Sequence, residues 1–337
     1  MYLENKYLTD EISLRVNGKF PYQQEDIDFL DLINSRLEEI EDSLTKDAEE
    51  DHPNIWILGV SRSGTTLLSQ LVFNCLDIAC TNNFMARFWK VPVVGCLLSK
   101  IILGDRKSNS FASEYGKTKD AYSPHEFGWF WQNLLQANDL LSYNPAKAAR
   151  SINWDFLRLK ILNMNRVLEK GIIFKPLEYA AYHFEKFNSV FPKSIFIYIS
   201  RDSRDVAFSL AKARLDYYKN IDTWWGSIPL RDYPQLTDKP FWQQIAGQIF
   251  YLKKMYEEDL EKADRERLIF TSYDEICSAP QEFLNQVIET VRKLFSYELR
   301  QINKPPDKFV SNNKQRVDKQ IEERLVQGLK LYDLLNN

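Results

Sequence analysis

Residues 55–66 read I-W-I-L-G-V-S-R-S-G-T-T, and this stretch decides the fold. Its first part is an apolar run rich in β-branched residues, which is typical of a buried strand. The run breaks into a polar turn, and apolar side chains then recur at helical spacing at Leu67, Leu68, Leu71, Val72 and Cys75. The stretch therefore predicts a strand, a loop and a helix whose N-terminus points backbone N–H groups at an anion.

The loop nearly matches a nucleotide-binding P-loop, but it lacks the lysine of that motif. Gly59 and Gly64 have the G-x-x-x-x-G spacing, and Thr65-Thr66 stand where a P-loop has Lys followed by Ser or Thr. An enzyme acting on a nucleoside triphosphate would miss the side chain that reaches the outer phosphates. Arg62 and Ser63 favour a smaller, fixed anion instead. The alternative is a plain Gly-Ser turn between a strand and a helix.

A second segment also predicts a strand, a polar turn and a helix. Residues 195–209 read I-F-I-Y-I-S-R-D-S-R-D-V-A-F-S, an apolar run followed by a helical pattern. Arg201 ends the run, and Asp202 is placed to cap the helix that follows. Asp205 falls in the first turn of that helix, with Ser209 one turn further on the same face, so Ser209 and Arg201 can converge on one phosphate. A competing interpretation makes Asp202 the metal-holding acid of a Walker B strand.

Together these segments resemble those of the sulfotransferases that use 3′-phosphoadenosine 5′-phosphosulfate (PAPS). In that family an R-S-G-T-T loop binds the 5′-phosphosulfate, and an R-D-x-R-D-x-x-x-S segment binds the 3′-phosphate; this chain contains both. The resemblance implies an α/β fold of the P-loop NTPase-like sulfotransferase type, a three-layer arrangement with a parallel sheet flanked by helices. It also implies one group of residues at the 5′ end, Arg62, Ser63, Gly64, Thr65 and Thr66, and a second at the 3′ end, Arg201 and Ser209.

Two further stretches extend the resemblance. Residues 171–176 read G-I-I-F-K-P, and Lys175 is similar to the family's lysine beside the transferred sulfonate. Residues 268–280 read L-I-F-T-S-Y-D-E-I-C-S-A-P, where the resemblance implies that the Tyr273 ring packs on adenine. The alternatives are that Lys175 is a surface lysine at a strand end and that Tyr273 is a half-buried strand residue.

Sulfonate transfer should resemble phosphoryl transfer, in which catalysis comes mainly from positioning and charge stabilisation. The resemblance implies PAPS as co-substrate, and no metal is needed. A general base must take the acceptor's proton. Many family members place a histidine two residues after the equivalent of Lys175, but Leu177 stands at that position here. Other branches of the family use a glutamate.

The best candidates for the base lie in residues 122–133, which read Y-S-P-H-E-F-G-W-F-W-Q-N. Glu126 is the first candidate, ahead of His125 and of Glu178 in another segment. A carboxylate among aromatic side chains has a raised pKa, which suits a proton acceptor. The alternative is that residues 123–126 only start a helix, with Glu126 in its first turn. The two interpretations are compatible.

Composition excludes several classes of protein. The 337 residues carry 44 Lys and Arg against 47 Asp and Glu, a net charge of −3, so the overall basic charge expected for nucleic-acid binding is missing. The cysteines lack C-x-x-C spacing and the histidines lack metal-ligand spacing, so we expect free buried thiols, no metal and a cytoplasmic location. The longest apolar stretch, residues 91–104, is too short to span a bilayer. It favours a buried helix over one that docks on a membrane surface.

The chain divides into an N-terminal helical extension, residues 1–50, and one sulfotransferase domain with helical insertions, residues 51–337. Four strand candidates between residues 55 and 270 favour a single parallel sheet. The extension carries an apolar stripe formed by Leu30, Ile33, Leu37, Ile40 and Leu44, with Glu and Asp on the other face. The stripe predicts packing on the protein's own core, with a homodimer as the alternative.

Two aromatic-rich stretches, residues 82–95 and 217–242, are candidates for the acceptor site, although they could also cover the core. Lys314 and Arg316 could fold over the nucleotide as the family's C-terminal basic loop does. We expect a PAPS-dependent sulfotransferase that acts on a hydroxyl of a carbohydrate, glycolipid or small metabolite. The alternatives are a P-loop kinase or NTPase that needs Mg-ATP, and a non-catalytic nucleotide-binding protein.

Overall fold

The computed structural model describes residues 24–108, 110–137, 139–176, 178–311 and 317–335. Leu177, Lys314 and Arg316, to which the sequence drew attention, lie outside these ranges.

A parallel sheet of five strands, in the order β2-β3-β1-β4-β5, forms the middle of the molecule. The strands are β1 (Asn54–Leu58), β2 (Ala79–Cys80), β3 (Ile172–Phe174), β4 (Ser194–Ser200) and β5 (Leu268–Ser272). Four of them coincide with the strands predicted from the sequence. The fifth, β2, has only two residues, which is too short for a periodic pattern to reveal.

Both faces of the sheet are buried, because side chains alternate along each strand. On β1, Ile55 and Ile57 enter one apolar core, while Trp56 and Leu58 enter the other. The ring of Trp56 stacks on that of Phe174 of β3, with 4.6 Å between centroids. Near-continuous apolar runs such as residues 55–58 therefore fold into strands covered on two sides.

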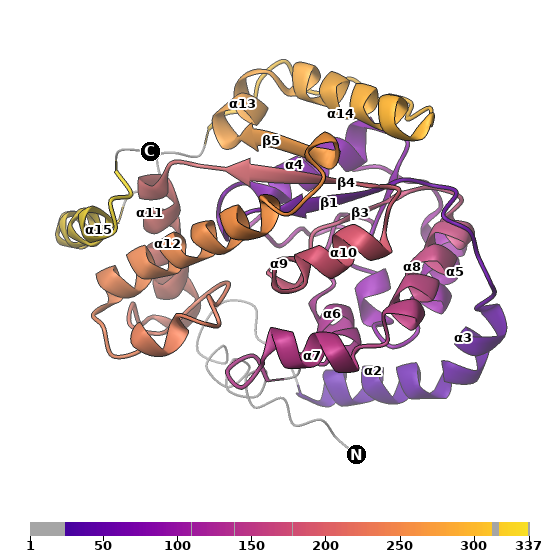
Figure 1. Ribbon diagram of the computed structural model, residues 1–337, viewed down its shortest axis with the longest axis horizontal. Helices are drawn as coiled ribbons and strands as arrows, with labels where there is room; N and C mark the ends of the chain where they lie inside the picture. Colours follow the sequence, from indigo (N-terminus) through magenta and orange to yellow (C-terminus); the bar gives the residue numbers. More distant parts are fainter. Residues whose placement is uncertain (1–23, 109, 138, 177, 312–316, 336–337) are drawn as a thin grey trace.

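Helices cover the sheet on both faces, which makes the predicted three layers (Figure 1). One face is covered by α4 (Thr65–Cys75), α13 (Tyr273–Ser278) and α14 (Pro280–Phe295). The other is covered by α8 (Trp154–Leu168), α10 (Phe184–Val190), α11 (Ser203–Tyr218) and α12 (Phe241–Leu260). The helix predicted after residue 66 is α4, and the helix predicted after Asp202 is α11.

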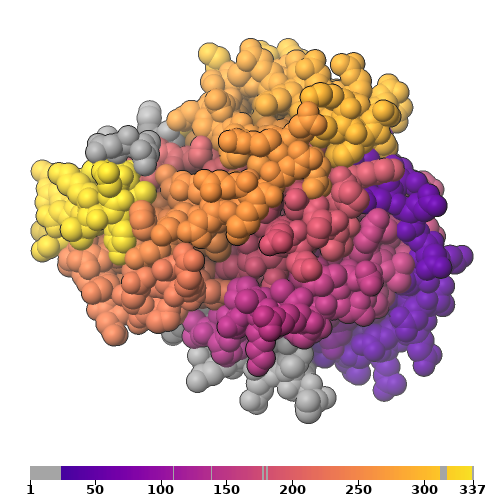
Figure 2. Space-filling view, in the orientation of Figure 1, coloured from indigo at the N-terminus to yellow at the C-terminus, as the bar shows by residue number. Residues whose placement is uncertain are grey.

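The remaining elements surround this centre. The α-helices are α2 (Gln24–Arg36), α3 (Glu38–Leu44), α5 (Pro92–Leu103), α6 (Gly128–Leu134), α7 (Pro145–Ser151), α9 (Tyr179–Tyr182) and α15 (Lys319–Leu331). The short 3-10 helices are η1 (Met85–Arg87), η2 (Tyr233–Gln235) and η3 (Arg265–Arg267). In the space-filling view, α2 and α3 at the indigo end and α15 at the yellow end lie on opposite sides of the molecule (Figure 2).

The N-terminal helices pack on the protein's own core, as predicted, but largely through polar contacts. Glu41 is 1% exposed, and its carboxylate accepts hydrogen bonds from the first N–H groups of α5 and from Lys160. Ile40, which the apolar stripe placed toward the core, is 49% exposed. The expectation that acidic residues fill only the solvent face was wrong at Glu41, because the N-terminus of α5 and a buried lysine attract its charge.

The apolar stretch 91–104 forms α5, and most of this helix is buried as expected. Its last turn carries two exposed side chains, Ile101 and Ile102. None of the helices in the described ranges is both long and apolar enough to cross a bilayer. All four cysteines are free and buried, which confirms the expected thiol state.

Candidate functional site

The loop between β1 and α4 depends on two glycines. Gly64 caps α4 with φ of +107°, and a Cβ atom there would lie 2.5 Å from Cδ2 of Tyr273. Gly59 has φ of +153°, and its Cβ would meet Ile199 O and Ser63 Oγ, both at 2.7 Å. The G-x-x-x-x-G spacing is thus required by the backbone and by close packing. It places the N-terminus of α4 at the carboxyl edge of the sheet, where parallel α/β proteins bind ligands.

Between the glycines the chain makes a tight turn that presents Arg62. The N–H of Ser63 donates to the carbonyl of Val60 at 3.0 Å, and Arg62 occupies the third position with φ of +75°. That position usually takes glycine. The hydroxyl of Ser63 is buried and has no hydrogen-bond partner within the described part of the chain.

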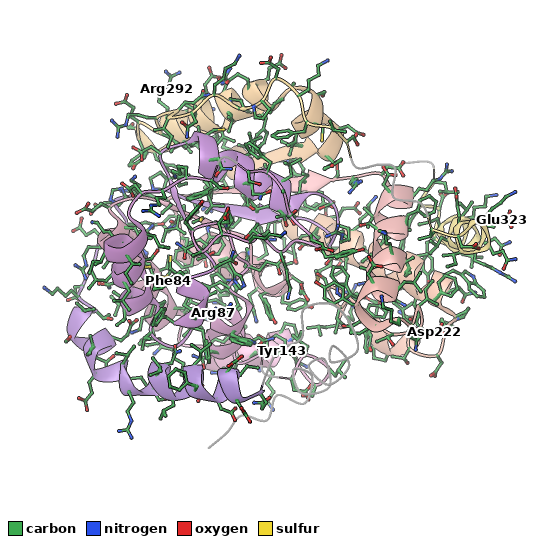
Figure 3. The ribbon with its side chains drawn as sticks, turned by 180° about the vertical axis from the view of Figure 1, so that it is seen from behind. Phe84, Arg87, Tyr143, Asp222, Arg292 and Glu323 are labelled. Carbon is green, nitrogen blue, oxygen red and sulfur yellow. The ribbon has the colours of Figure 1, made fainter. Side chains whose placement is uncertain are left out.

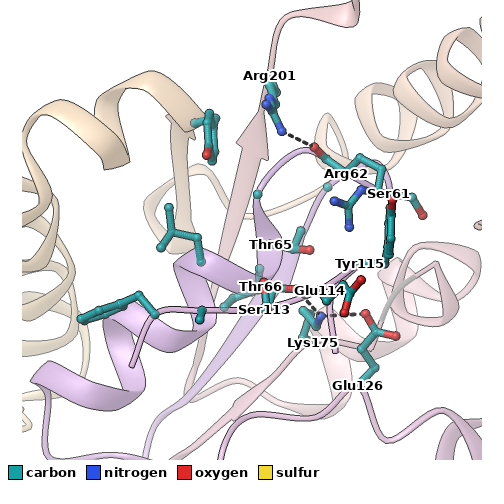
Figure 4. Close-up of a pocket in the computed structure, with 18 of the residues that line it drawn as sticks. Ser61, Arg62, Thr65, Thr66, Ser113, Glu114, Tyr115, Glu126, Lys175 and Arg201 are labelled. Carbon is teal, nitrogen blue, oxygen red and sulfur yellow. Dashed lines mark hydrogen bonds and ion pairs between the residues drawn. The ribbon is translucent and has the colours of Figure 1, made fainter. Parts of the chain in front are cut away.

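Arg62 joins the two predicted phosphate segments. Its Nε donates to Ser209 Oγ at 2.8 Å. Its carbonyl accepts from Arg201 Nη1 at 3.1 Å (Figure 4). Desolvation, followed by the charge of Arg201, lowers the pKa of the Arg62 guanidinium. No carboxylate pairs with Arg62 among the described residues. Two guanidinium groups so close together, one of them with no carboxylate partner in the described ranges, favour an anionic ligand.

Arg201 also contacts side chains of two helices, α13 and α11. Its Cζ lies 4.2 Å from the centroid of the Tyr273 ring, and its Nε lies 3.9 Å from Asp205 Oδ2. Asp202 caps α11 as predicted, accepting from the N–H groups of Arg204 and Asp205. Because this carboxylate is used by the cap, the geometry does not favour the Walker B interpretation. One face of the Tyr273 ring is already occupied by Arg201, so adenine could use only its remaining surface.

Lys175 and Glu126 form an ion pair at the other end of the loop. Lys175 Nζ lies 2.7 Å from Glu126 Oε1 and donates to Thr66 Oγ1 at 2.8 Å (Figure 4). The Lys175 side chain is 3% exposed and that of Glu126 is 36% exposed. The carboxylate therefore faces an ammonium group, and it does not lie in the aromatic surroundings expected from the sequence. Glu126 precedes α6, which begins at Gly128, so the expectation that it falls in a first helical turn was wrong.

The other two candidate bases have different partners. His125 Nδ1 accepts from the N–H of Phe127 at 2.8 Å, and desolvation lowers the pKa of His125 to about 4. Glu178 is buried and accepts from the hydroxyl of Ser227 at 2.7 Å, and burial raises the pKa of its carboxyl group. Of the three candidates only Glu126 faces the cavity described next.

A cavity of about 560 Å³ opens along the loop. Its lining includes most of the predicted residues, namely Arg62, Gly64, Thr65, Thr66, Glu126, Lys175, Arg201 and Tyr273. In the described part of the structure, Ser63, His125, Glu178 and Ser209 do not line it. Ser209 reaches the site only through its bond to Arg62. Arg201 and Ser209 can therefore contact the same phosphate, as predicted, only if Arg62 also contacts that phosphate or moves away from Ser209.

A segment that sequence reasoning missed forms the outer wall of the cavity. This strap, residues 111–117, turns at Tyr115 and Gly116, with φ of +50° and +84° and a bridge between Glu114 and Lys117. A Cβ on Gly116 would lie 3.5 Å from Glu126 Oε1 and 3.9 Å from Lys175 Nζ. The Tyr-Gly pair amid polar residues was a signal for a turn, but nothing local indicated that the turn faces the loop.

The strap is attached at both ends. The hydroxyl of Tyr115 donates to Asp216 of α11, and its ring centroid lies 5.3 Å from Cζ of Arg62. At the other end, the ring of Phe111 contacts that of Phe309 with 4.9 Å between centroids. The cavity thus has an apolar end near Phe111 and a polar end near Lys175 and Glu126.

The two stretches expected to line an acceptor site differ. Trp225, from residues 217–242, lines the cavity. Residues 82–95 do not appear in that lining within the described structure, because Phe88 packs against Gly95 and Trp89 against Trp129. Figure 3 shows Phe84 and Arg87 on the side of the N-terminal helices, away from Asp222. Residues 82–95 therefore do not line this cavity, and their acceptor-lining role stays a prediction.

Within the described ranges, no three His, Cys, Asp or Glu side chains are grouped so that they could hold a metal ion. The arrangement combines a phosphate-type loop, two guanidinium groups, and a lysine paired with a carboxylate. Such a site can bind an anionic group, stabilise charge that develops on its oxygens, and accept a proton.

Comparison with known proteins gives one match in sequence. A family model described as "Sulfotransferase family" matches residues 53–292, and no curated protein matches the sequence. Among solved structures, the sulfotransferase STF9 from Mycobacterium avium is 15% identical with a TM-score of 0.45, covering 90% of this chain and 81% of that one. STF1 from Mycobacterium tuberculosis H37Rv is 11% identical with a TM-score of 0.47, covering 88% and 81%. A sulfotransferase from Alicyclobacillus acidocaldarius is 15% identical with a TM-score of 0.42, covering 84% and 94%.

Proposed function

The chain belongs to the sulfotransferase family, and we propose that it transfers a sulfonate group from PAPS to an acceptor hydroxyl. The observation that carries the proposal is the pair of contacts made by Arg62. Its side chain bonds to Ser209 and its carbonyl to Arg201, which brings the two phosphate segments together beside one cavity. A nucleotide with a phosphate at each end would bind both segments. A nucleoside triphosphate would find no P-loop lysine for its outer phosphates, because Thr65 stands at that position.

The residues present suit such a donor. The N–H groups at the start of α4 and the hydroxyls of Thr65 and Thr66 would hold the 5′ end. Arg201, with Arg62 and Ser209 behind it, would hold the 3′-phosphate. The apolar end of the cavity, near Phe111 and Tyr273, offers surface for adenine. PAPS, when bound, would supply the sulfonate and a good leaving group.

Lys175 and Glu126 are placed for the two chemical tasks. The Lys175 ammonium would donate to oxygens that gain charge as the sulfonate is transferred, which lowers the barrier most where water is excluded. When the second substrate binds, its hydroxyl would lie between Glu126 and Lys175. Glu126 would then accept the proton of that hydroxyl. The 2.7 Å contact with Lys175 holds the Glu126 carboxylate at the cavity before the acceptor arrives.

The acceptor is proposed from the polar end of the cavity. Glu114, Asp216 and Lys212 offer hydrogen-bonding groups there, and Trp225 offers an aromatic face. This combination suits a hydroxyl-rich acceptor such as a carbohydrate, the head of a glycolipid or a small polar metabolite. A cytoplasmic location and a possible homodimer stay predictions from the sequence.

Isothermal titration calorimetry tests the proposed donor. Adenosine 3′,5′-bisphosphate, the product of the donor, should bind with micromolar or better affinity in the absence of a divalent metal. Mg-ATP should bind at least about tenfold more weakly, a difference of roughly 1.4 kcal/mol. Tighter binding of Mg-ATP would replace the proposal with a P-loop kinase or NTPase.

A further inference from the structure

A chain of hydrogen bonds connects buried Glu178 to the phosphate loop. Glu178 is 5% exposed and follows the segment that carries Lys175. Its Oε2 lies 2.7 Å from Ser227 Oγ, which lies 2.6 Å from Ser61 Oγ. Ser61 lines the cavity and directly precedes Arg62. The three side chains come from parts of the sequence that no local pattern connects.

The direction of these bonds follows from their chemistry. An ionised Glu178 can only accept, so the hydroxyl of Ser227 donates to it. Ser227 Oγ must then accept from the hydroxyl of Ser61, while Ser61 Oγ accepts from the N–H of Ser227 at 3.2 Å. Ser61 is therefore held by two bonds to Ser227, and one of them depends on the carboxylate.

The backbone of residues 225–228, which carries Ser227, is itself held in place by hydrogen bonds. Gln248 Nε2 donates to the carbonyl of Ser227 at 2.7 Å and to that of Trp225 at 3.0 Å. The Tyr182 hydroxyl donates to the carbonyl of Ile228 at 2.6 Å. Gly226, with φ of +85°, comes so close to Ser61 that a Cβ atom would lie 3.3 Å from Ser61 Oγ.

The turn that receives this support is strained. Arg62 is a non-glycine residue with φ of +75°, a conformation that costs free energy and persists only where its surroundings enforce it. On one side Arg201 and Ser209 bind Arg62 itself. On the other side Ser227 binds its neighbour Ser61. Removal of either attachment would let the turn relax and would displace the guanidinium.

We propose that Glu178, acting through Ser227 and Ser61, is a positioning residue that holds the strained turn and so places Arg62 for the donor. In this role Glu178 sets the geometry of the phosphate loop. The inference rests on the proposed function only for its effect on donor binding, because the held turn is a property of the free protein.

The test compares Ser227→Ala with two matched variants. Ser227→Thr keeps the hydroxyl, and Tyr182→Phe removes a different hydrogen bond of the same segment without touching Ser61. Glu178→Leu, which removes the acceptor of the Ser227 hydroxyl, tests the carboxylate itself, and Glu178→Gln, which can still accept from Ser227, is its matched rescue variant. The readouts are amide hydrogen exchange of residues 60–64 in the free protein, and the dissociation constant of adenosine 3′,5′-bisphosphate.

Ser227→Ala and Glu178→Leu should each raise the exchange rate of residues 60–64 at least tenfold and weaken the bisphosphate about tenfold, roughly the loss of one hydrogen bond. A Glu178→Leu protein that matches the parent in both readouts would remove Glu178 from the proposal. Ser227→Thr, Glu178→Gln and Tyr182→Phe should stay within about threefold of the parent protein in both readouts. Equal effects of Ser227→Ala and Tyr182→Phe, or no effect of Ser227→Ala, would overturn the inference. If the parent protein binds no bisphosphate, the proposed function fails, and the exchange comparison alone decides the inference.

Discussion

Single residues at this site act through their neighbours. The side chain of Arg62 donates a hydrogen bond to Ser209, and its carbonyl accepts one from Arg201. Its backbone also has a strained conformation, with φ of +75°. The sequence predicted Arg62, Arg201 and Lys175 as site residues because their motifs are local. It did not predict Ser61 or Ser227, because the bond between them joins residues 166 positions apart. Such contacts depend on how the loops meet in space.

Replacing Arg201 by Ala should weaken adenosine 3′,5′-bisphosphate more than 5′-AMP, because only the bisphosphate carries the second phosphate. We expect a difference of at least about tenfold, the usual size for a lost hydrogen bond to a charged group. Calorimetry with both nucleotides measures it. Arg204→Ala, which removes the same charge from an exposed position of α11, is the control. Equal losses for the two nucleotides would remove Arg201 from the 3′-phosphate site.

Replacing Glu126 by Gln should preserve donor affinity and lower turnover by about two orders of magnitude or more, the usual contribution of a general base. The change keeps the shape of the side chain and its reach to Lys175. Transfer from radiolabelled PAPS, with an acceptor found by assaying extracts of the source cells, gives the turnover. If the variant turns over at the parental rate, the proton acceptor is another residue.

Among the elements, helix ends do much of the positioning. The N-terminus of α4 begins at the proposed anion site, and Asp202 at the start of α11 orders the segment that carries Arg201. The N-terminus of α5 is completed by Glu41 from a different helix. The sequence pattern correctly located α4 and α11, but the apolar stripe of the N-terminal helices wrongly assigned Glu41 to the solvent-facing side. A buried carboxylate can be predicted only when its partner is known, and the partner of Glu41, Lys160, lies 119 residues away in the sequence.

Removing the Glu41 carboxylate should strongly destabilise the fold. Glu41→Ala leaves Lys160, 3% exposed, without its ion-pair partner, and it frees two N–H groups at the start of α5. Breaking a buried pair on one side costs about 3–5 kcal/mol. Urea unfolding should show this as a lower midpoint at an unchanged slope. Glu39→Ala, on the exposed side of α3, is the control; an equally small effect of both changes would contradict the account.

At the scale of the whole molecule, the predicted architecture is confirmed. The apolar runs at residues 55–58 and 195–199 are strands that meet in the middle of a parallel sheet, and their polar ends lie at the same edge. The strap across that edge escaped prediction, because it has little apolar periodicity and its place is set by contacts with Asp216 and Phe309. The sequence thus predicts the sheet and the loop, and the tertiary structure decides what covers them.

The stability of the molecule should fall in weak acid, in part through His183. This residue is buried against Tyr143, and burial lowers the pKa of His183 from 6.5 to about 4. Between these values the unfolded chain binds more protons than the folded one, so stability decreases as the pH falls from 6.5 toward 4.

The loss attributable to His183 is of the order of 3 kcal/mol. His183→Gln, which cannot titrate, should flatten the plot of unfolding free energy against pH in this range, although it also removes a constant contribution from the Tyr143 contact. Urea titrations at a series of pH values measure both. Parallel plots for the variant and the parent protein would show that His183 does not titrate in the predicted way.

The central claim is that the loop at residues 59–66 and the segment at residues 201–209 bind the two phosphates of one nucleotide. The most direct measurement is a crystal structure of the protein with adenosine 3′,5′-bisphosphate. The account predicts the 5′-phosphate at the N–H groups that begin α4, and the 3′-phosphate within hydrogen-bond distance of Arg201. A nucleotide bound outside this cavity, or one whose 3′-phosphate touches neither Arg201 nor Arg62, would contradict it.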